Sequence, residues 1–91
     1  MIHYPAIYTE AVTPDIIEST DNGTYIGWLS RGKEYDRSLS PEGQPVWRIR
    51  FVSESEDGNG NEIKQFLYPN GLDDYSFAWN DRDSLTYSYR K

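Results

Sequence analysis

The sequence predicts an all-β fold, a small antiparallel sheet or flattened barrel of four to five strands with an extended N-terminal arm. Runs rich in aromatic and β-branched residues alternate with Gly, Asn and Asp turn signals in the C-terminal half. Aromatic residues make up 15% of the 91 residues, so we expect one small domain whose core is built from large rings. The three clearest runs are residues 46–52, 63–68 and 84–89.

The first 20 residues carry two prolines and scattered apolar residues without a period, which predicts an extended arm. Thr13-Pro14-Asp15 can open a single helical turn, with Thr13 as its N-cap. Residues 20–23 predict a turn, and the β-branched and aromatic run 24–29 predicts the first strand. The expected organisation is therefore an arm over residues 1–20 and a single small β domain over residues 21–91.

The connection over residues 30–45 is polar, contains two Gly and two Pro, and shows no periodicity. A connection of this length in a small domain is either a binding loop or a solvated, disordered segment. An extended arm is also suited to wrapping a neighbouring protein. The candidate partner-binding residues in the arm and the loop are Tyr4, Tyr8, Arg31, Lys33, Tyr35 and Arg37.

Residues 46–68 predict a hairpin with two possible tight turns, Asp57-Gly58 and Asn59-Gly60. A turn centred on Asp57-Gly58 places Trp47 opposite Tyr68 and makes one face almost entirely apolar, so this register is preferred. A turn centred on Asn59-Gly60 loses that aromatic pair. A longer loop that uses both glycines remains an alternative.

A fourth strand is predicted over residues 72–79, because aromatic residues alternate there with small ones. In the final strand, over residues 84–89, the apolar residues share one face. We expect Trp47 and Trp79 to be buried structural anchors. The alternating residues of these two strands are Tyr75, Phe77 and Trp79, then Leu85, Tyr87 and Tyr89.

The residue inventory predicts no catalytic, cofactor-binding or metal-binding site. The chain has no Cys, and its one histidine is His3 in the predicted arm. Two pairs of carboxylates, Asp73/Asp74 and Asp81/Asp83, are interpreted as turn caps or solvated charge. Residues 57–62 resemble a calcium loop, but Glu62 stands where an EF-hand loop needs glycine, so a hairpin turn explains them better.

The tryptophans Trp28, Trp47 and Trp79 could instead form a stacking platform for sugars or single-stranded nucleic acid. Rings that alternate with polar residues are more often core. The net charge of −6 opposes binding to nucleic acid or to an anionic membrane, and no run of apolar residues is long enough to span a bilayer. The absence of Cys suits a reducing cytoplasm.

Three blocks of the chain resemble a group of short proteins encoded among the structural genes of tailed bacteriophages. The blocks are residues 25–27, 47–50 and 77–87. The chain departs from that pattern at the charged stretch 31–37 and at Asp83, where the group has small residues. The resemblance implies a virion protein, made in the cytoplasm of the bacterial host, that decorates the capsid or joins neck or tail parts. Its implied partners are other virion proteins or copies of itself.

Two other functions stay open. A small phage product with this acidic charge could be an inhibitor that docks on a basic surface of a host protein. A carbohydrate-binding module on a fibre is the other alternative, and it requires an exposed aromatic ring.

Overall fold

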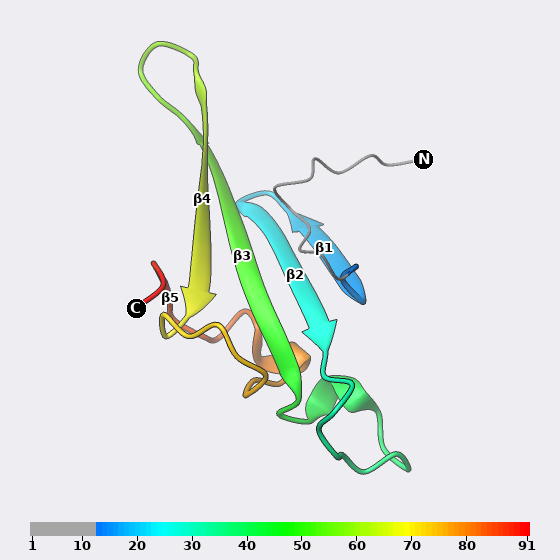
Figure 1. The fold of residues 1–91 in the computed structure, drawn as a ribbon. Coiled ribbons are helices and arrows are strands. Elements are labelled where there is room, and N and C mark those ends of the chain that lie inside the picture. Colours follow the sequence, from blue (N-terminus) through cyan, green and yellow to red (C-terminus); the bar gives the residue numbers. More distant parts are fainter. Residues whose placement is uncertain (1–12) are drawn as a thin grey trace.

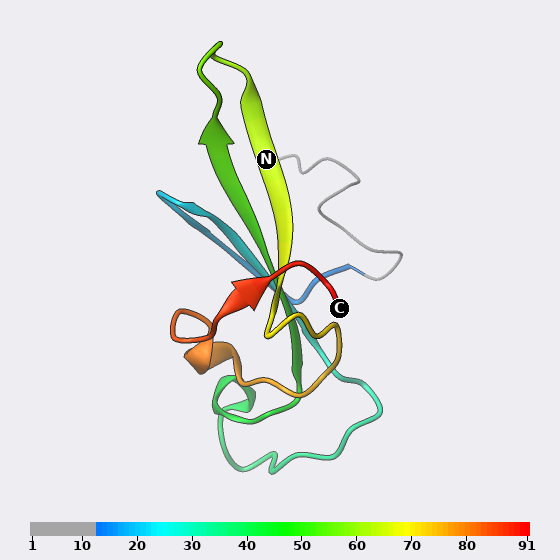
Figure 2. The ribbon, with the colours of Figure 1, turned by 90° about the vertical axis from the view of Figure 1, so that its left-hand side faces the viewer.

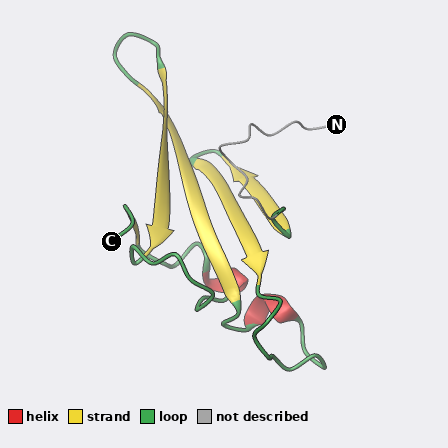
Figure 3. Cartoon of the chain, viewed as in Figure 1, coloured by secondary structure: helices red, strands yellow, loops and turns green. Residues whose placement is uncertain are grey.

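The computed structural model describes residues 13–91 and shows an all-β fold (Figure 1). Five strands form a single antiparallel sheet in the order β1-β2-β3-β4-β5, and the described part of the chain contains no α-helix (Figure 3). Because β1 and β5 both remain edge strands, the sheet is open, and the predicted sheet rather than a closed barrel is confirmed. The elements are β1 (Ile16–Thr20), β2 (Gly23–Leu29), the 3-10 helix η2 (Pro41–Gly43), β3 (Trp47–Glu56), β4 (Glu62–Pro69), the 3-10 helix η3 (Trp79–Asp81) and β5 (Tyr87–Ser88).

The sheet begins inside the segment that was expected to be an arm. Residues 16–20 form β1 and pair with β2, so this part of the predicted arm belongs to the sheet. Strand alternation places Ile16 and Ile17 on opposite faces, and each packs against a different apolar cluster. No helical turn starts at Thr13, because the Asp15 N–H donates to the Gly27 carbonyl at 2.9 Å and extends the ladder. The predicted arm over residues 1–12 lies outside the described residues.

The β3–β4 hairpin adopts the longer loop rather than the preferred tight turn. Val52 lies opposite Phe66 and Glu56 opposite Glu62, which leaves residues 57–61 as the loop. The Asp57 carboxylate accepts the backbone N–H groups of Asn59 and Asn61 at 2.8 and 2.9 Å. The predicted register was wrong. It was chosen from the cross-strand side-chain pairs alone, whereas the Asp57 carboxylate stabilises a wider loop by accepting two of its backbone N–H groups.

Apolar clusters form on both faces of the sheet. One cluster contains Trp47, Ile49 and Trp79, and the other contains Ile26, Trp28 and Val52. Trp28, Trp47 and Trp79 are only 1%, 3% and 3% exposed, so the predicted burial of Trp47 and Trp79 is confirmed. The buried rings also rule out the predicted alternative of a tryptophan stacking platform.

The predicted strand over residues 72–79 is wrong. Only Phe77 makes a bridge, to Trp47, and the chain then turns into η3. Tyr75 packs against the Trp28 cluster while Phe77 lies in the Trp47 cluster, so this segment passes from one face of the sheet to the other. The alternation of rings reflects that crossing rather than a strand. Figure 2 shows that the part of the chain after this crossing, drawn in orange to red, runs across one side of the sheet.

The last strand is shorter than predicted. β5 contains only Tyr87 and Ser88, which pair with the end of β4. Leu85 and Tyr87 pack against the Trp47 cluster as expected, but Tyr89 is 63% exposed. Arg82 anchors this segment to the far edge of the sheet, since its guanidinium donates to both carboxylate oxygens of Glu18 at 2.9 and 3.0 Å.

Candidate functional site

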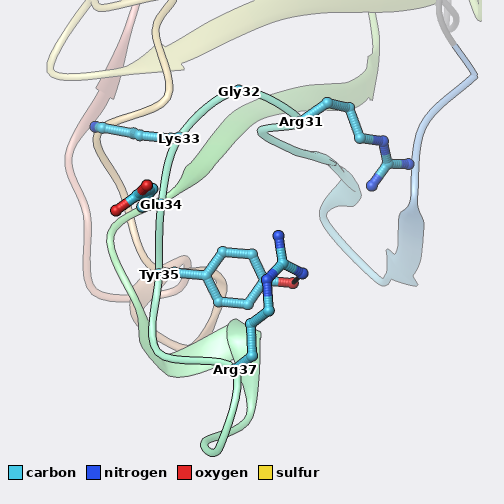
Figure 4. A pocket seen from close by; sticks show the side chains of 6 residues that line it. All are labelled: Arg31, Gly32, Lys33, Glu34, Tyr35 and Arg37. Atoms are coloured by element: carbon cyan, nitrogen blue, oxygen red, sulfur yellow. Dashed lines mark hydrogen bonds between the residues drawn. The ribbon is translucent and has the colours of Figure 1, made fainter.

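The loop over residues 30–45 encloses an open pocket of about 250 Å³ (Figure 4). The loop connects the end of β2 to the start of β3, so the pocket lies at the end of the sheet opposite the tip of the β3–β4 hairpin (Figure 1). All four loop residues predicted to bind a partner line it. The complete lining is Arg31, Gly32, Lys33, Glu34, Tyr35 and Arg37.

Some site residues were not anticipated, and others cannot be placed. Gly32 and Glu34 line the pocket although the sequence analysis did not select them. Their position between selected residues was the only signal available. The other two predicted partner-binding residues, Tyr4 and Tyr8, lie outside the described residues.

The first half of the loop is held to the sheet by Arg31 and Asp15. The Arg31 guanidinium lies 2.5 Å from Asp15 Oδ1, and Asp15 Oδ2 accepts the Leu29 N–H at 2.8 Å. This carboxylate therefore joins the end of β2 to the start of the loop. In Figure 4 the Arg31 side chain accordingly extends toward β1, in blue, and away from Tyr35. The Arg31 side chain is 70% exposed, so water screens this ion pair strongly.

Two further contacts fix the remainder of the loop. Lys33 Nζ donates to the Tyr75 carbonyl at 2.7 Å. The Gln44 side chain accepts the Asp36 N–H at 2.7 Å and donates to the Asp36 carbonyl at 2.8 Å, which joins the two arms of the loop. These bonds give the polar connection a defined path, as a binding loop requires.

Tyr35 and Arg37 form the centre of the pocket. The Arg37 guanidinium lies over the Tyr35 ring, 4.7 Å from its centroid, and Arg37 Nη1 donates to the Tyr35 hydroxyl at 3.2 Å. Tyr35 is half-buried against the Trp47 cluster, whereas Arg37 is exposed. The ring thus holds an exposed guanidinium in place, which reduces the conformational entropy lost when Arg37 binds an anionic group.

The pocket lining is cationic although the chain is acidic. It carries Arg31, Lys33 and Arg37 against the single carboxylate of Glu34. The loop has another carboxylate at Asp36, but this group accepts bonds from the Ser38 hydroxyl at 2.6 Å and the Ser38 N–H at 3.0 Å. Both bonds go to Asp36 Oδ1, and they lower the pKa of this carboxyl group. Because Arg31 is paired with Asp15 and Lys33 bonds the Tyr75 carbonyl, the exposed Arg37 guanidinium is the cation suited to binding a carboxylate from a partner.

A second charged cluster lies on the face of the sheet that carries Trp28, whose ring the Arg48 and Arg50 guanidinium groups cover. Asp73 accepts two bonds from Arg48, at 2.5 and 3.3 Å, and lies 3.8 Å from Arg50 and 3.5 Å from Arg90. Burial raises the pKa of Asp73, but the bond from Arg48 and the three positive charges outweigh it and lower the pKa. The prediction that Asp73 is a turn cap or solvated charge is therefore wrong. The prediction failed because nothing in the sequence pattern, including the preferred hairpin register, indicated that these arginines would lie near Asp73.

The remaining candidates have structural explanations. Asp57 orders the hairpin loop through the bonds described above, which explains the calcium-like spacing of residues 57–62. Within residues 13–91 no group of three His, Cys, Asp or Glu side chains is placed to hold a metal ion. No helix in the same range is long and apolar enough to cross a membrane.

Comparison of the chain with protein-family models, with curated proteins and with solved structures found no match in any of the three.

Proposed function

We propose that this chain is a non-enzymatic component of a tailed-phage virion, in capsid decoration or neck and tail attachment, that acts by protein–protein binding through the pocket of its 30–45 loop. The observation that carries the binding role is one pocket lined by Arg31, Lys33, Tyr35 and Arg37, with the exposed Arg37 guanidinium held over the Tyr35 ring. The virion location depends on the resemblance of the Tyr25, Trp47 and Trp79 blocks to short phage structural proteins.

The size and composition of the pocket favour a protein partner over a small ligand. Its volume of about 250 Å³ lies below the roughly 300–1,000 Å³ of typical small-molecule sites, and its rim is charged rather than apolar. Arginine and tyrosine are the residue types that most often dominate protein interfaces. Leu39, in the same loop, is 60% exposed and offers adjacent apolar contact area. The pocket is suited to receiving one or two side chains of a partner.

Quantitative mass spectrometry of washed virions tests the proposal. A phage that encodes the wild-type chain should retain it in particles at a constant ratio to the capsid protein. Arg37→Glu reverses the charge of the exposed pocket cation that lies over the Tyr35 ring and should deplete the chain from particles at least tenfold. Lys91→Glu makes the same charge change at an exposed position outside the pocket and should leave the ratio unchanged.

Two results would contradict the proposal in different ways. If the wild-type chain is absent from washed particles, the virion role is wrong. If the Arg37→Glu chain is retained as well as wild type, the pocket is not the attachment site.

An acidic inhibitor of a host protein is a second candidate, favoured by the carboxylates gathered on the β3–β4 hairpin. Residues 54–64 contain Glu54, Glu56, Asp57 and Glu62 against one Lys64. Such an inhibitor would be found in the infected cell and not in the virion, so the same measurement separates the two functions.

A further inference from the structure

The outer half of the β3–β4 hairpin projects beyond the rest of the sheet (Figure 1). β2 pairs with β3 only as far as Ser53, and β5 pairs with β4 only at Tyr68 and Pro69. Residues 54–56 and 62–64 therefore pair with each other, and the Glu54 N–H also donates to the Asn22 carbonyl in the β1–β2 turn at 3.2 Å. An isolated two-stranded hairpin is marginally stable in water, so this projection gains from a surface that covers it.

One face of the projecting hairpin is acidic. Glu54 lies opposite Lys64, and Glu56 lies directly opposite Glu62. Directly opposed residues share a face, so three carboxylates and one ammonium group lie together. Together with Asp57, the hairpin carries half of the chain's net charge of −6.

The Glu56–Glu62 pair indicates what would bind there. Like charges directly opposite in an antiparallel pair destabilise it. Lys64 Nζ contacts the carboxylates of Glu54 and Glu62, but among residues 13–91 no cation forms an ion pair with Glu56. A guanidinium or ammonium group from outside would relieve the repulsion between the two glutamates.

The same chain presents such cations at its other end. The pocket formed by Arg31, Lys33 and Arg37 and the acidic hairpin tip lie at opposite ends of a molecule that is 50 Å along its longest axis (Figures 1 and 4). A single copy cannot bring these two surfaces together. Two copies placed end to end can.

We propose that the acidic hairpin of one copy docks in the loop pocket of the next, so that the chain associates with itself head to tail. Glu56 then lies against the exposed Arg37 of the neighbouring copy. This inference rests on the proposed binding role of the pocket and names its partner as a second copy of this chain. The two surfaces differ, so the contact is heterologous and a dimer leaves one pocket and one hairpin free. Association therefore continues beyond a dimer, into a ring or a filament.

Sedimentation velocity and native mass spectrometry of the purified full chain test this contact. Wild type should exceed the 10.6 kDa monomer mass increasingly with concentration and return to monomer at about 1 M salt, where the screening length falls to about 3 Å. Arg37→Glu and Glu56→Lys should each remain monomeric. The matched controls Lys91→Glu and Asp21→Lys, at exposed positions outside both surfaces, should associate like wild type.

Glu56→Lys also separates assembly from folding. It replaces the repulsive Glu56–Glu62 pair with an attractive one, so its melting temperature should equal or exceed that of wild type while association is lost. A loss of association in this variant therefore cannot be attributed to unfolding.

Mixing the two variants supplies the decisive test. Arg37→Glu retains an intact hairpin and Glu56→Lys retains an intact pocket, so an equimolar mixture should regain association although each variant alone is monomeric. The intact hairpin of one variant fits the intact pocket of the other, and the two exchanged charges attract each other as well. The double variant Arg37→Glu/Glu56→Lys, in which both charges are exchanged, should regain association beyond a dimer.

Several results would overturn the head-to-tail contact: a wild-type chain that stays monomeric at every concentration and salt, single variants that associate like wild type, or a mixture of the two variants that stays monomeric. Detection of the chain in washed virions does not depend on these outcomes. The proposed function and this inference can therefore fail separately.

Discussion

Truncation of Trp47 should remove most of the stability of the domain. Its side chain is buried in the cluster with Trp79, with the ring centroids 5.8 Å apart, and its Nε1–H donates to the Pro41 carbonyl at 2.9 Å. Folding buries about 150–250 Å² of a tryptophan, which at about 25 cal/mol per Å² corresponds to about 4–6 kcal/mol. Substitution of a buried aromatic residue by alanine lowers the free energy of unfolding by a similar amount, about 3–5 kcal/mol. Since a domain is stable by roughly 5–15 kcal/mol, Trp47→Ala should unfold or aggregate.

Trp47→Phe separates the ring from its hydrogen bond. Phenylalanine keeps most of the apolar contact but cannot donate to Pro41, so the loss should be only about 0.5–1.5 kcal/mol beyond the smaller ring area. For a domain of this size each kcal/mol lowers the melting temperature by about 4–8 °C. Thermal and urea unfolding, followed by circular dichroism, should therefore rank wild type above Trp47→Phe and both far above Trp47→Ala. If Trp47→Ala melts like wild type but no longer binds its partner, Trp47 is an interface residue and the reasoning is refuted.

Three other changes test separate parts of the structure. A Cβ at Gly27 would lie 2.7 Å from the Trp79 ring, so Gly27→Ala should cost about 1–3 kcal/mol in urea unfolding. Gly58→Ala, with no atom within 4 Å of its Cβ, should cost less than about 0.5 kcal/mol; equal losses would contradict the packing at Gly27. Because the arginines lower the pKa of Asp73 below its ordinary 3.8, its contribution to stability should be complete above about pH 4 and decline as pH falls through the folded pKa. Asp73→Asn should lower stability at pH 7 and flatten that acid decline, with Asp74→Asn as the control; an unchanged profile would exclude Asp73 as its source. Arg31→Ala and Lys33→Ala, at exposed loop positions, should change the free energy of unfolding by less than about 1 kcal/mol and affect partner binding alone, so a large melting shift would make the loop structural.

The sequence by itself determined the fold class, the strand over residues 24–29 and the hairpin between residues 46 and 68. Period-two alternation, β-branched residues and glycine turns are local signals, and local geometry is sufficient to produce them. It also predicted that Trp47 and Trp79 are core residues, since large rings dominate what a chain of this size can bury. The four loop residues selected from charge and aromatic character all line one pocket.

Only the tertiary structure decided the hairpin register, the strand at residues 16–20 and the path of residues 72–79. The Asp57 carboxylate selected a five-residue loop, and Ile16 and Ile17 became a strand because β2 offers them two apolar faces. The alternating rings from Tyr75 to Trp79 predicted a strand. The same spacing is produced when a segment crosses from one face of the sheet to the other, and the sequence alone does not distinguish the two. The convergence of three arginines on Asp73 likewise joins residues distant in sequence. Such contacts depend on how elements pack together, and packing is a property of the whole fold rather than of any local pattern.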